Sequence, residues 1–120
     1  MGYNVSLYKV PEEFRNQEIH EAMLEDMLSS LSYDDDTDKY LLLHTNFSSG
    51  NPNALDFEEI FDIEVTMDDF YKIYKMEDFI KTKNKTIKID DSELMERINK
   101  FLKVIELELN KGEIIFFSCD

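Results

Sequence analysis

Five short stretches of the chain have the pattern of a β-strand. In the first, Tyr3, Val5 and Leu7 alternate with polar residues, as side chains do in a strand with one buried face. The second contains three consecutive leucines, a run typical of a strand that is buried on both faces. The predicted strands are residues 3–10, 40–47, 60–65, 86–89 and 113–119. The third has a helical alternative, because residues 55–61 also fit one or two helical turns.

The first predicted helix begins at Pro11. Proline suits a first helical turn, and the two glutamates that follow it suit the positive end of the helix dipole. Apolar residues from Ile19 to Leu31 recur at helical spacing, and the helix should end near Ser32. Three glutamates should share its polar face: Glu18, Glu21 and Glu25.

Two further helices are predicted later in the chain. Thr66 and Asp69 have the spacing of an N-cap and its N3 partner, which predicts a helix over residues 67–80, although Tyr71 and Ile73 also fit the alternation of a strand. The last helix has Ser92 as its predicted N-cap and keeps an apolar stripe through five turns. It should end before Gly112, because glycine suits the left-handed residue of a C-cap.

Strands and helices alternate along the chain, but the middle strands are short and two connections are too tight for regular crossovers. The pattern therefore predicts an α+β fold: a sandwich with a four- or five-stranded mixed sheet and two or three helices mainly on one face. A length of 120 residues, 42% hydrophobic residues, and 9 Phe with 6 Tyr predict a single domain over residues 1–120 with a real core.

The acidic charge of the chain is segregated. Residues 1–69 hold 17 Asp/Glu and 3 Lys/Arg, a net charge of −14, whereas residues 70–120 hold 10 of each sign and are neutral. Repulsion among so many like charges destabilises a folded chain, and solubility alone could come from an even spread. The segregation is what a surface that attracts a positively charged partner would look like, and a generally acidic surface with no dedicated partner is an equal alternative.

The motifs of metal and cofactor sites are incomplete. Three aspartates match the first ligand positions of a calcium loop: Asp34, Asp36 and Asp38. Lys39 and Thr45 stand where that loop requires glycine and glutamate, so a solvated acidic loop is the favoured interpretation. Cys119 is the only cysteine, and 3 widely separated glycines exclude a P-loop or a Rossmann turn. We therefore expect no metal and no cofactor.

The histidines and carboxylates do not define a catalytic site. His20 lacks the second histidine that a zinc-protease motif would place at position 24, which is Leu24. His44 lies in the leucine-rich strand, where a core histidine bonded to a neighbour is the favoured interpretation. Paired carboxylates act as acid and base when burial separates their pKa values, but almost every acid here lies on a predicted polar face or loop. We expect no enzyme, although a carboxylate-dependent enzyme or a structural subunit stays an alternative.

The basic residues do not form a nucleic-acid site. One cluster is present: Lys81, Lys83, Lys85 and Lys88. Its expected setting is a solvated turn whose lysines discourage strand pairing, because phosphate binding needs a broader basic surface. No apolar run reaches the roughly 18–20 residues of a membrane helix, and no leader pattern opens the chain. We expect a cytoplasmic protein that contacts neither nucleic acid nor membrane.

A protein partner with a basic surface fits these observations best. The candidate binding residues come from three acidic segments: Glu18, Glu21, Glu25, Asp34, Asp35, Asp36, Asp38, Asp62, Glu64, Asp68 and Asp69. Tyr33 and Tyr40 flank the middle segment and would supply aromatic anchors if exposed. The sequence predicts an immunity protein that neutralises a nuclease toxin by occlusion. A nucleic-acid mimic that inhibits a DNA- or RNA-handling complex is the alternative within the same class.

Overall fold

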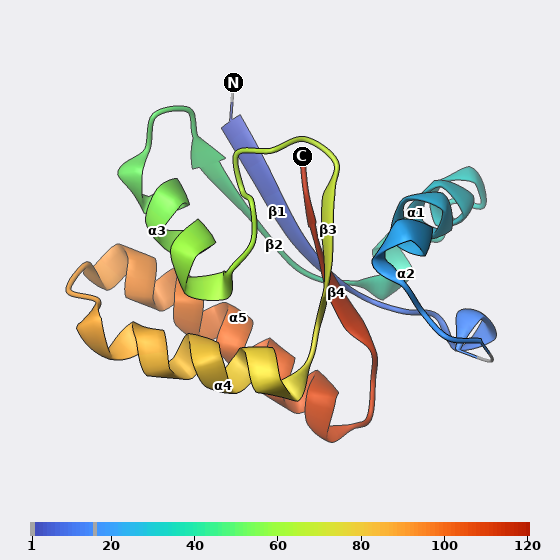
Figure 1. Cartoon of the computed structure of the whole chain (residues 1–120). Coiled ribbons are helices and arrows are strands. Elements are labelled where there is room, and N and C mark those ends of the chain that lie inside the picture. The colour runs from blue at the N-terminus through green and yellow to red at the C-terminus, as the bar shows by residue number, and fades with distance from the viewer. Residues whose placement is uncertain (1, 16) are drawn as a thin grey trace.

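The four strands form one antiparallel sheet with the order β2-β1-β4-β3 (Figure 1). The structure is a computed structural model that describes residues 2–15 and 17–120. The strands are β1 (Gly2–Lys9), β2 (Leu41–Ser48), β3 (Phe70–Tyr74) and β4 (Ile115–Cys119). The α-helices are α1 (Leu24–Tyr33), α2 (Thr37–Tyr40), α3 (Pro52–Phe61), α4 (Met76–Lys85) and α5 (Ser92–Asn110). The predicted α+β class is confirmed, but the sheet is not mixed and the described residues form five α-helices rather than two or three.

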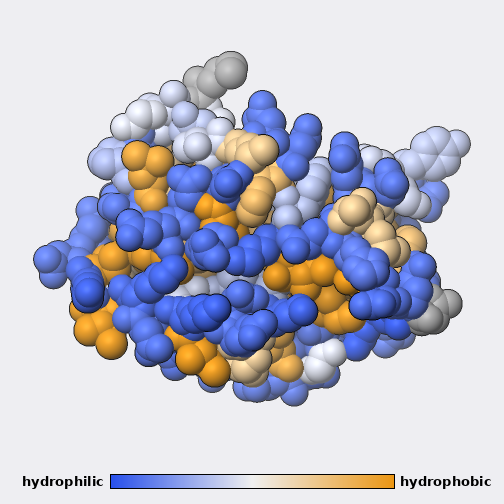
Figure 2. Space-filling view, viewed as in Figure 1, coloured by the Kyte–Doolittle hydropathy of each residue, from blue (hydrophilic) through white to orange (hydrophobic). Residues whose placement is uncertain are grey.

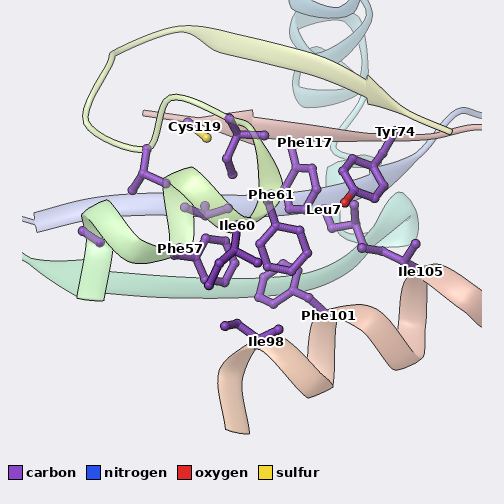
Figure 3. Packing of buried hydrophobic residues seen from close by; sticks show 14 of the residues in the cluster. Leu7, Phe57, Ile60, Phe61, Tyr74, Ile98, Phe101, Ile105, Phe117 and Cys119 are labelled. Carbon is purple, nitrogen blue, oxygen red and sulfur yellow. The ribbon is translucent and has the colours of Figure 1, made fainter. Parts of the chain in front are cut away.

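The inner face of the sheet packs against α3, α4 and α5 and carries the larger core. Aromatic rings dominate it, as Figure 3 shows: Phe57, Phe61, Phe101, Phe117 and Tyr74 point toward one another from four different elements. The centroids of Phe57 and Phe61 are 4.5 Å apart, and those of Tyr74 and Phe117 are 5.2 Å apart. Val5 and Leu7 reach this core from β1, which confirms the alternation predicted for the first strand.

The outer face is covered only at one end, by α1 and the chain that leads into it (Figure 1). Leu24 and Met27 pack there against Phe116 and Val10 in a second, smaller cluster. The other end of this face carries accessible polar side chains: Asn4, Ser6, His44, Asn46 and Ser118. The two faces therefore differ in both size and chemistry.

The first predicted helix forms only in its second half. Residues 12–14 and 21–23 are separate 3₁₀ turns, and α1 begins at Leu24; residue 16, inside the predicted span, lies outside the described residues. A tertiary contact explains the difference. Arg15 donates to the carbonyl oxygen of Gly112 over 2.8 Å and pairs with Glu113 over 3.1 Å, which ties this segment to the α5–β4 connection. The helical spacing of the apolar residues carries no information about this long-range contact, so it predicted a helix that begins too early.

The strand predicted at residues 60–65 and the helix predicted at 67–80 are both wrong. α3 continues to Phe61, as the alternative assignment proposed, and ends at Asp62 in the left-handed conformation with φ 57°. Ile63 and Val65 are buried from an irregular segment, so their alternation reflects burial without a strand. The capping pattern at Thr66 is unused, because residues 65–69 are turns and bends and lead into β3. The alternation that competed with the helical pattern there was the correct signal.

Of the remaining predicted elements, one is wrong and three are present. The strand at 86–89 is wrong, since α4 extends to Lys85 and a 3₁₀ turn follows. The second strand is present as β2, but it lies at an edge of the sheet rather than between two covered faces, so His44 is exposed and not a core residue. The last helix and last strand are confirmed. The predicted cap is wrong by one residue: Asp91 rather than Ser92 caps α5, because the Asp91 carboxylate accepts the Leu94 N–H over 2.8 Å, and Gly112 has φ 81°.

Candidate functional site

A groove of about 600 Å³ opens between α1 and the outer face of the sheet. We refer to it as the α1 groove. It is lined by residues of α1, α2 and three strands or their ends: Tyr8, Glu25, Leu28, Ser29, Ser32, Tyr33, Thr37, Asp69, Tyr71, Ser118 and Asp120. Because α1 covers only one end of the face, the groove is open to solvent along its side. It continues into the accessible polar end of the sheet through Ser118.

Three carboxylates meet in the α1 groove from separate parts of the chain. Glu25 comes from α1, Asp69 from the turn before β3, and Asp120 follows β4. None of the three forms an ion pair with a described Lys, Arg or His. Some carboxylates elsewhere are paired, as Asp62 is with Lys72 at 3.2 Å, whereas others, such as Asp34 and Asp35, are exposed and also lack an ion pair to a described cation. The groove is therefore a place where negative charge is concentrated without an internal counterion.

Two tyrosines form the floor of the groove on the sheet. Burial raises the pKa of Tyr71, and the charges of Asp69, Glu25 and Asp120 raise it further. Burial also raises the pKa of Tyr8 against a lowering hydrogen bond from Ser6, with Asp120 and Asp38 adding to the increase. Both phenols thus stay protonated well above neutral pH. Asp120 acts on both rings, while Asp69 and Glu25 act on Tyr71 and Asp38 acts on Tyr8, so each phenol lies in a negative environment.

Two tyrosine rings of the groove, Tyr8 and Tyr33, differ in their surroundings. Tyr8 stacks on Phe116 with ring centroids 5.5 Å apart and an interplanar angle of 21°, which fixes it against the small core. Tyr33, at the end of α1, is 92% exposed and reaches solvent at the rim. Aromatic faces beside carboxylates can hold an ammonium or guanidinium group, since the ring quadrupole and the carboxylates both attract it. The arrangement suits capture of a positive side chain.

The structure brings some of the predicted binding residues together and separates others. Glu25 and Asp69 line the α1 groove, and Asp38 is close enough to affect the pKa of Tyr8. Glu18 and Glu21 precede α1, so the predicted helix face with Glu25 does not exist. The turn after α1 holds exposed Asp34 and Asp35, while Asp36 pairs with Lys39 at 3.0 Å.

The third acidic segment turns partly away from the groove. Asp62 pairs with Lys72, which lies on the inner face of β3. Burial raises the pKa of Cys119 to about 12, and Asp120, Glu58 and Glu64 add to the increase, which places Glu64 near α3. Asp68 is exposed next to Asp69. Two of the eleven predicted binding residues therefore line the α1 groove directly.

The lining residues that the sequence analysis did not single out include Tyr8, Tyr71 and Asp120. Tyr8 and Asp120 lie in or beside strands that were interpreted by their buried side, and Tyr71 lay in a predicted helix. Tyr8 and Tyr71 come from β1 and β3, which are separated in the sheet by β4. Only the strand order brings them into one groove. The alternation of Asn4, Ser6 and Tyr8 on one side of the first strand was the available signal for a ring on the outer face.

A second groove, of about 500 Å³, lies between α4 and α5 and differs in charge. Phe79, Leu102 and Leu107 line it together with Lys83 and Lys103. Figure 2 shows hydrophobic side chains reaching the surface over these helices. The lysine cluster lies on α4 and the 3₁₀ turn after it, where Lys85 donates to the Glu59 carbonyl over 3.0 Å, rather than on a turn before a strand. This groove does not share the concentrated negative charge of the α1 groove.

Comparisons of the chain with protein-family models, with curated proteins and with solved structures find no match. Among residues 2–15 and 17–120, no group of three or more His, Cys, Asp or Glu side chains is arranged to hold a metal ion. Within the same residues, no helix combines the length and apolar character that crossing a membrane requires. The geometry of the α1 groove is therefore the main guide to function.

Proposed function

We propose that this chain is a binding protein that captures a basic partner at the α1 groove and blocks the partner's own binding surface. The observation that supports the proposal is the meeting of Glu25, Asp69 and Asp120, without internal counterions, above a floor of two tyrosines. A nuclease toxin domain is the partner class that fits best, because such a domain presents the cationic side chains that bind phosphate. The chain would then be an immunity protein, acting in the cytoplasm where that toxin is harmful.

The mechanism has two steps. The net charge of −14 attracts the partner over a distance, and electrostatic steering of this kind can raise association rates toward ~10⁸–10⁹ M⁻¹s⁻¹ at low salt. Close contact then places a lysine or arginine of the partner between the carboxylates and the phenol rings. Tyr33 and Leu28 extend the contact with apolar and aromatic surface, the kind of anchor that stabilises tight interfaces. The occupied cationic groups can no longer bind phosphate.

An affinity capture with a matched variant pair tests the proposal. The groove variant carries Glu25→Gln, Asp69→Asn and Asp120→Asn. The control variant removes the same charge from exposed acids elsewhere, with Asp56→Asn, Glu59→Gln and Asp90→Asn. We expect the parent and control chains to retain the same basic protein from extracts of the source cells, and the groove variant to lose it. The retained protein should have nuclease activity that one equivalent of the parent chain abolishes.

Two results would contradict the proposal. Equal retention by the groove and control variants would show that charge alone, and not the groove, holds the partner. Retention of several unrelated DNA-binding proteins, each displaced by duplex DNA, would instead indicate a nucleic-acid mimic.

A further inference from the structure

The two edges of the sheet are protected differently. The edge strand β3 has five residues and carries Lys72, both features that discourage pairing with another chain. The opposite edge strand, β2, has eight residues with the sequence Leu-Leu-Leu-His-Thr-Asn-Phe-Ser, which contains no charged residue and no proline. Natural sheets seldom leave an edge of this length and composition unprotected unless something covers it.

The hydrogen-bond register identifies which groups of β2 face outward. Asn4 exchanges backbone hydrogen bonds with Asp120, over 3.0 and 3.1 Å, so its N–H and C=O point toward the β4 side. Its partner on β2, Asn46, must then direct its own N–H and C=O away from β1, and so must His44 two residues along. These outward groups form the free edge of the sheet.

Arg97 of α5 seals one half of this edge. Its Nη1 donates to the Asn46 carbonyl oxygen over 2.7 Å and to the Thr45 hydroxyl over 3.1 Å. Its guanidinium also lies 4.6 Å from the ring centroid of Phe47. We call residues 45–48 the sealed half of β2. A guanidinium held by three contacts blocks the approach of another strand there.

Residues 41–44 form the open half. Among the described residues, no side chain donates to or accepts from the backbone of His44. His44 is exposed, and the three leucines before it are only partly buried. The open half therefore offers unpaired backbone groups together with accessible apolar surface.

The surroundings of the open half indicate the chemistry of a segment that could bind there. α2 runs from Thr37 directly into β2, and Thr37 lines the α1 groove, so the open half begins where the groove ends. The acidic turn before α2 carries exposed Asp34 and Asp35, and α2 itself carries exposed Asp38; none of the three has an ion pair to a described cation. A segment lying along the open half would pass this negative charge. A second copy of the chain would bring a further net charge of −14 and be repelled.

We propose that the open half of β2 accepts an extended, lysine- or arginine-bearing segment of the basic partner as an added strand. This proposal rests on the proposed function, because it assigns a second contact to the same partner. Main-chain hydrogen bonds to His44 would supply binding that depends little on sequence, and the acidic turn would select for positive charge. The partner would thus be held by a side chain in the groove and by a strand at the edge.

Nuclear magnetic resonance on the full chain with a defined probe tests this inference. The probe is a short peptide of alternating threonine and lysine, and its control is the same sequence methylated on every backbone nitrogen. The two peptides carry equal charge, but only the first can donate to a strand edge. We expect the first peptide to shift the backbone amides of residues 41–44 and to slow hydrogen exchange at His44. The methylated peptide should bind about three- to tenfold more weakly, the loss expected when the peptide can no longer donate to the His44 carbonyl oxygen.

A matched pair of variants tests the same point on the protein. His44→Pro removes an outward N–H from the open half, and proline is tolerated at such an edge position. Asn46→Pro makes the equivalent change in the sealed half. We expect only His44→Pro to weaken binding of the threonine–lysine peptide, with thermal unfolding confirming that both variants fold.

Equal binding of the two peptides, absence of binding, or equal affinity of the two variants would overturn the edge assignment. None of these results would alter the outcome of the capture experiment with the groove variant, so failure here is distinguishable from failure of the proposed function.

Discussion

The two faces of the sheet differ in how well they are covered and in the charge that they carry. The inner face is covered by three helices and filled with aromatic rings, most of them fully buried. The outer face has a small cluster of four buried residues at one end, and beside it a groove with three carboxylates that have no internal counterions. Acids brought together in this way repel one another and contribute nothing to folding. Their placement on the sparsely covered face agrees with the proposal that the outer face binds a partner while the inner core stabilises the chain.

The largest expected effect is loss of an inner ring. Phe101→Ala removes a side chain that contacts Phe57, Phe61 and Phe117, and should lower the free energy of unfolding by about 3–5 kcal/mol because a cavity remains. Leu28→Ala, on the outer face, is the comparison, since Leu28 is only partly buried. Its cost in urea unfolding should be clearly smaller. Equal costs would mean that the outer cluster is as important for folding as the inner core.

The groove variant should lose affinity for the partner without losing stability. Neutralising Glu25, Asp69 and Asp120 should lower partner affinity at least about tenfold, because charge-assisted contacts are lost. Stability should be unchanged or slightly raised at low salt, and the difference from the parent should disappear at high salt as repulsion is screened. Chemical unfolding at two salt concentrations measures this. A clear loss of stability would show that the carboxylates support the fold, and would weaken their assignment to binding.

The contrast between local and distant signals explains what the sequence could predict. The first strand, α5 and the last strand were predicted because the local pattern and the tertiary setting agree there. α1 was assigned too early a start because Arg15 anchors the preceding segment to residues about a hundred positions away. The groove was predicted only in part. Glu25 and Asp69 were predicted as binding residues. That they line one groove with Tyr8, Tyr71 and Asp120 depends on a strand order that no local pattern encodes.

Glu108 offers a smaller test within the inner face. It is a buried carboxylate of α5 whose Oε2 has no hydrogen-bond partner among the described residues, and its nearest cation, on Lys111, is 3.5 Å from Oε1. Glu108→Met keeps a similar volume without a buried charge. We expect the free energy of unfolding to rise by about 1 kcal/mol, since an unsatisfied buried acceptor is costly. A decrease would assign Glu108 a stabilising contact.

The cap of α5 provides the smallest test. Asp91→Ala removes the carboxylate that accepts the Leu94 N–H and should cost about 1 kcal/mol in urea unfolding. Asp90→Ala deletes a neighbouring acid that caps nothing and should change stability by only a few tenths of that amount. If both substitutions cost the same, the helix start has been placed one residue too late.

The most direct test of the central claim is the rate at which the captured basic partner associates with the parent, groove and control chains as salt concentration is varied. Association with the parent and control chains should be fast and should slow steeply with salt, because long-range attraction depends on total charge. The groove variant should also form a complex that dissociates at least about tenfold faster than that of the control, since the contacts made at close range are missing. Identical dissociation of the two variants would contradict the account, because carboxylates in the α1 groove would then act no differently from acids anywhere else on the surface.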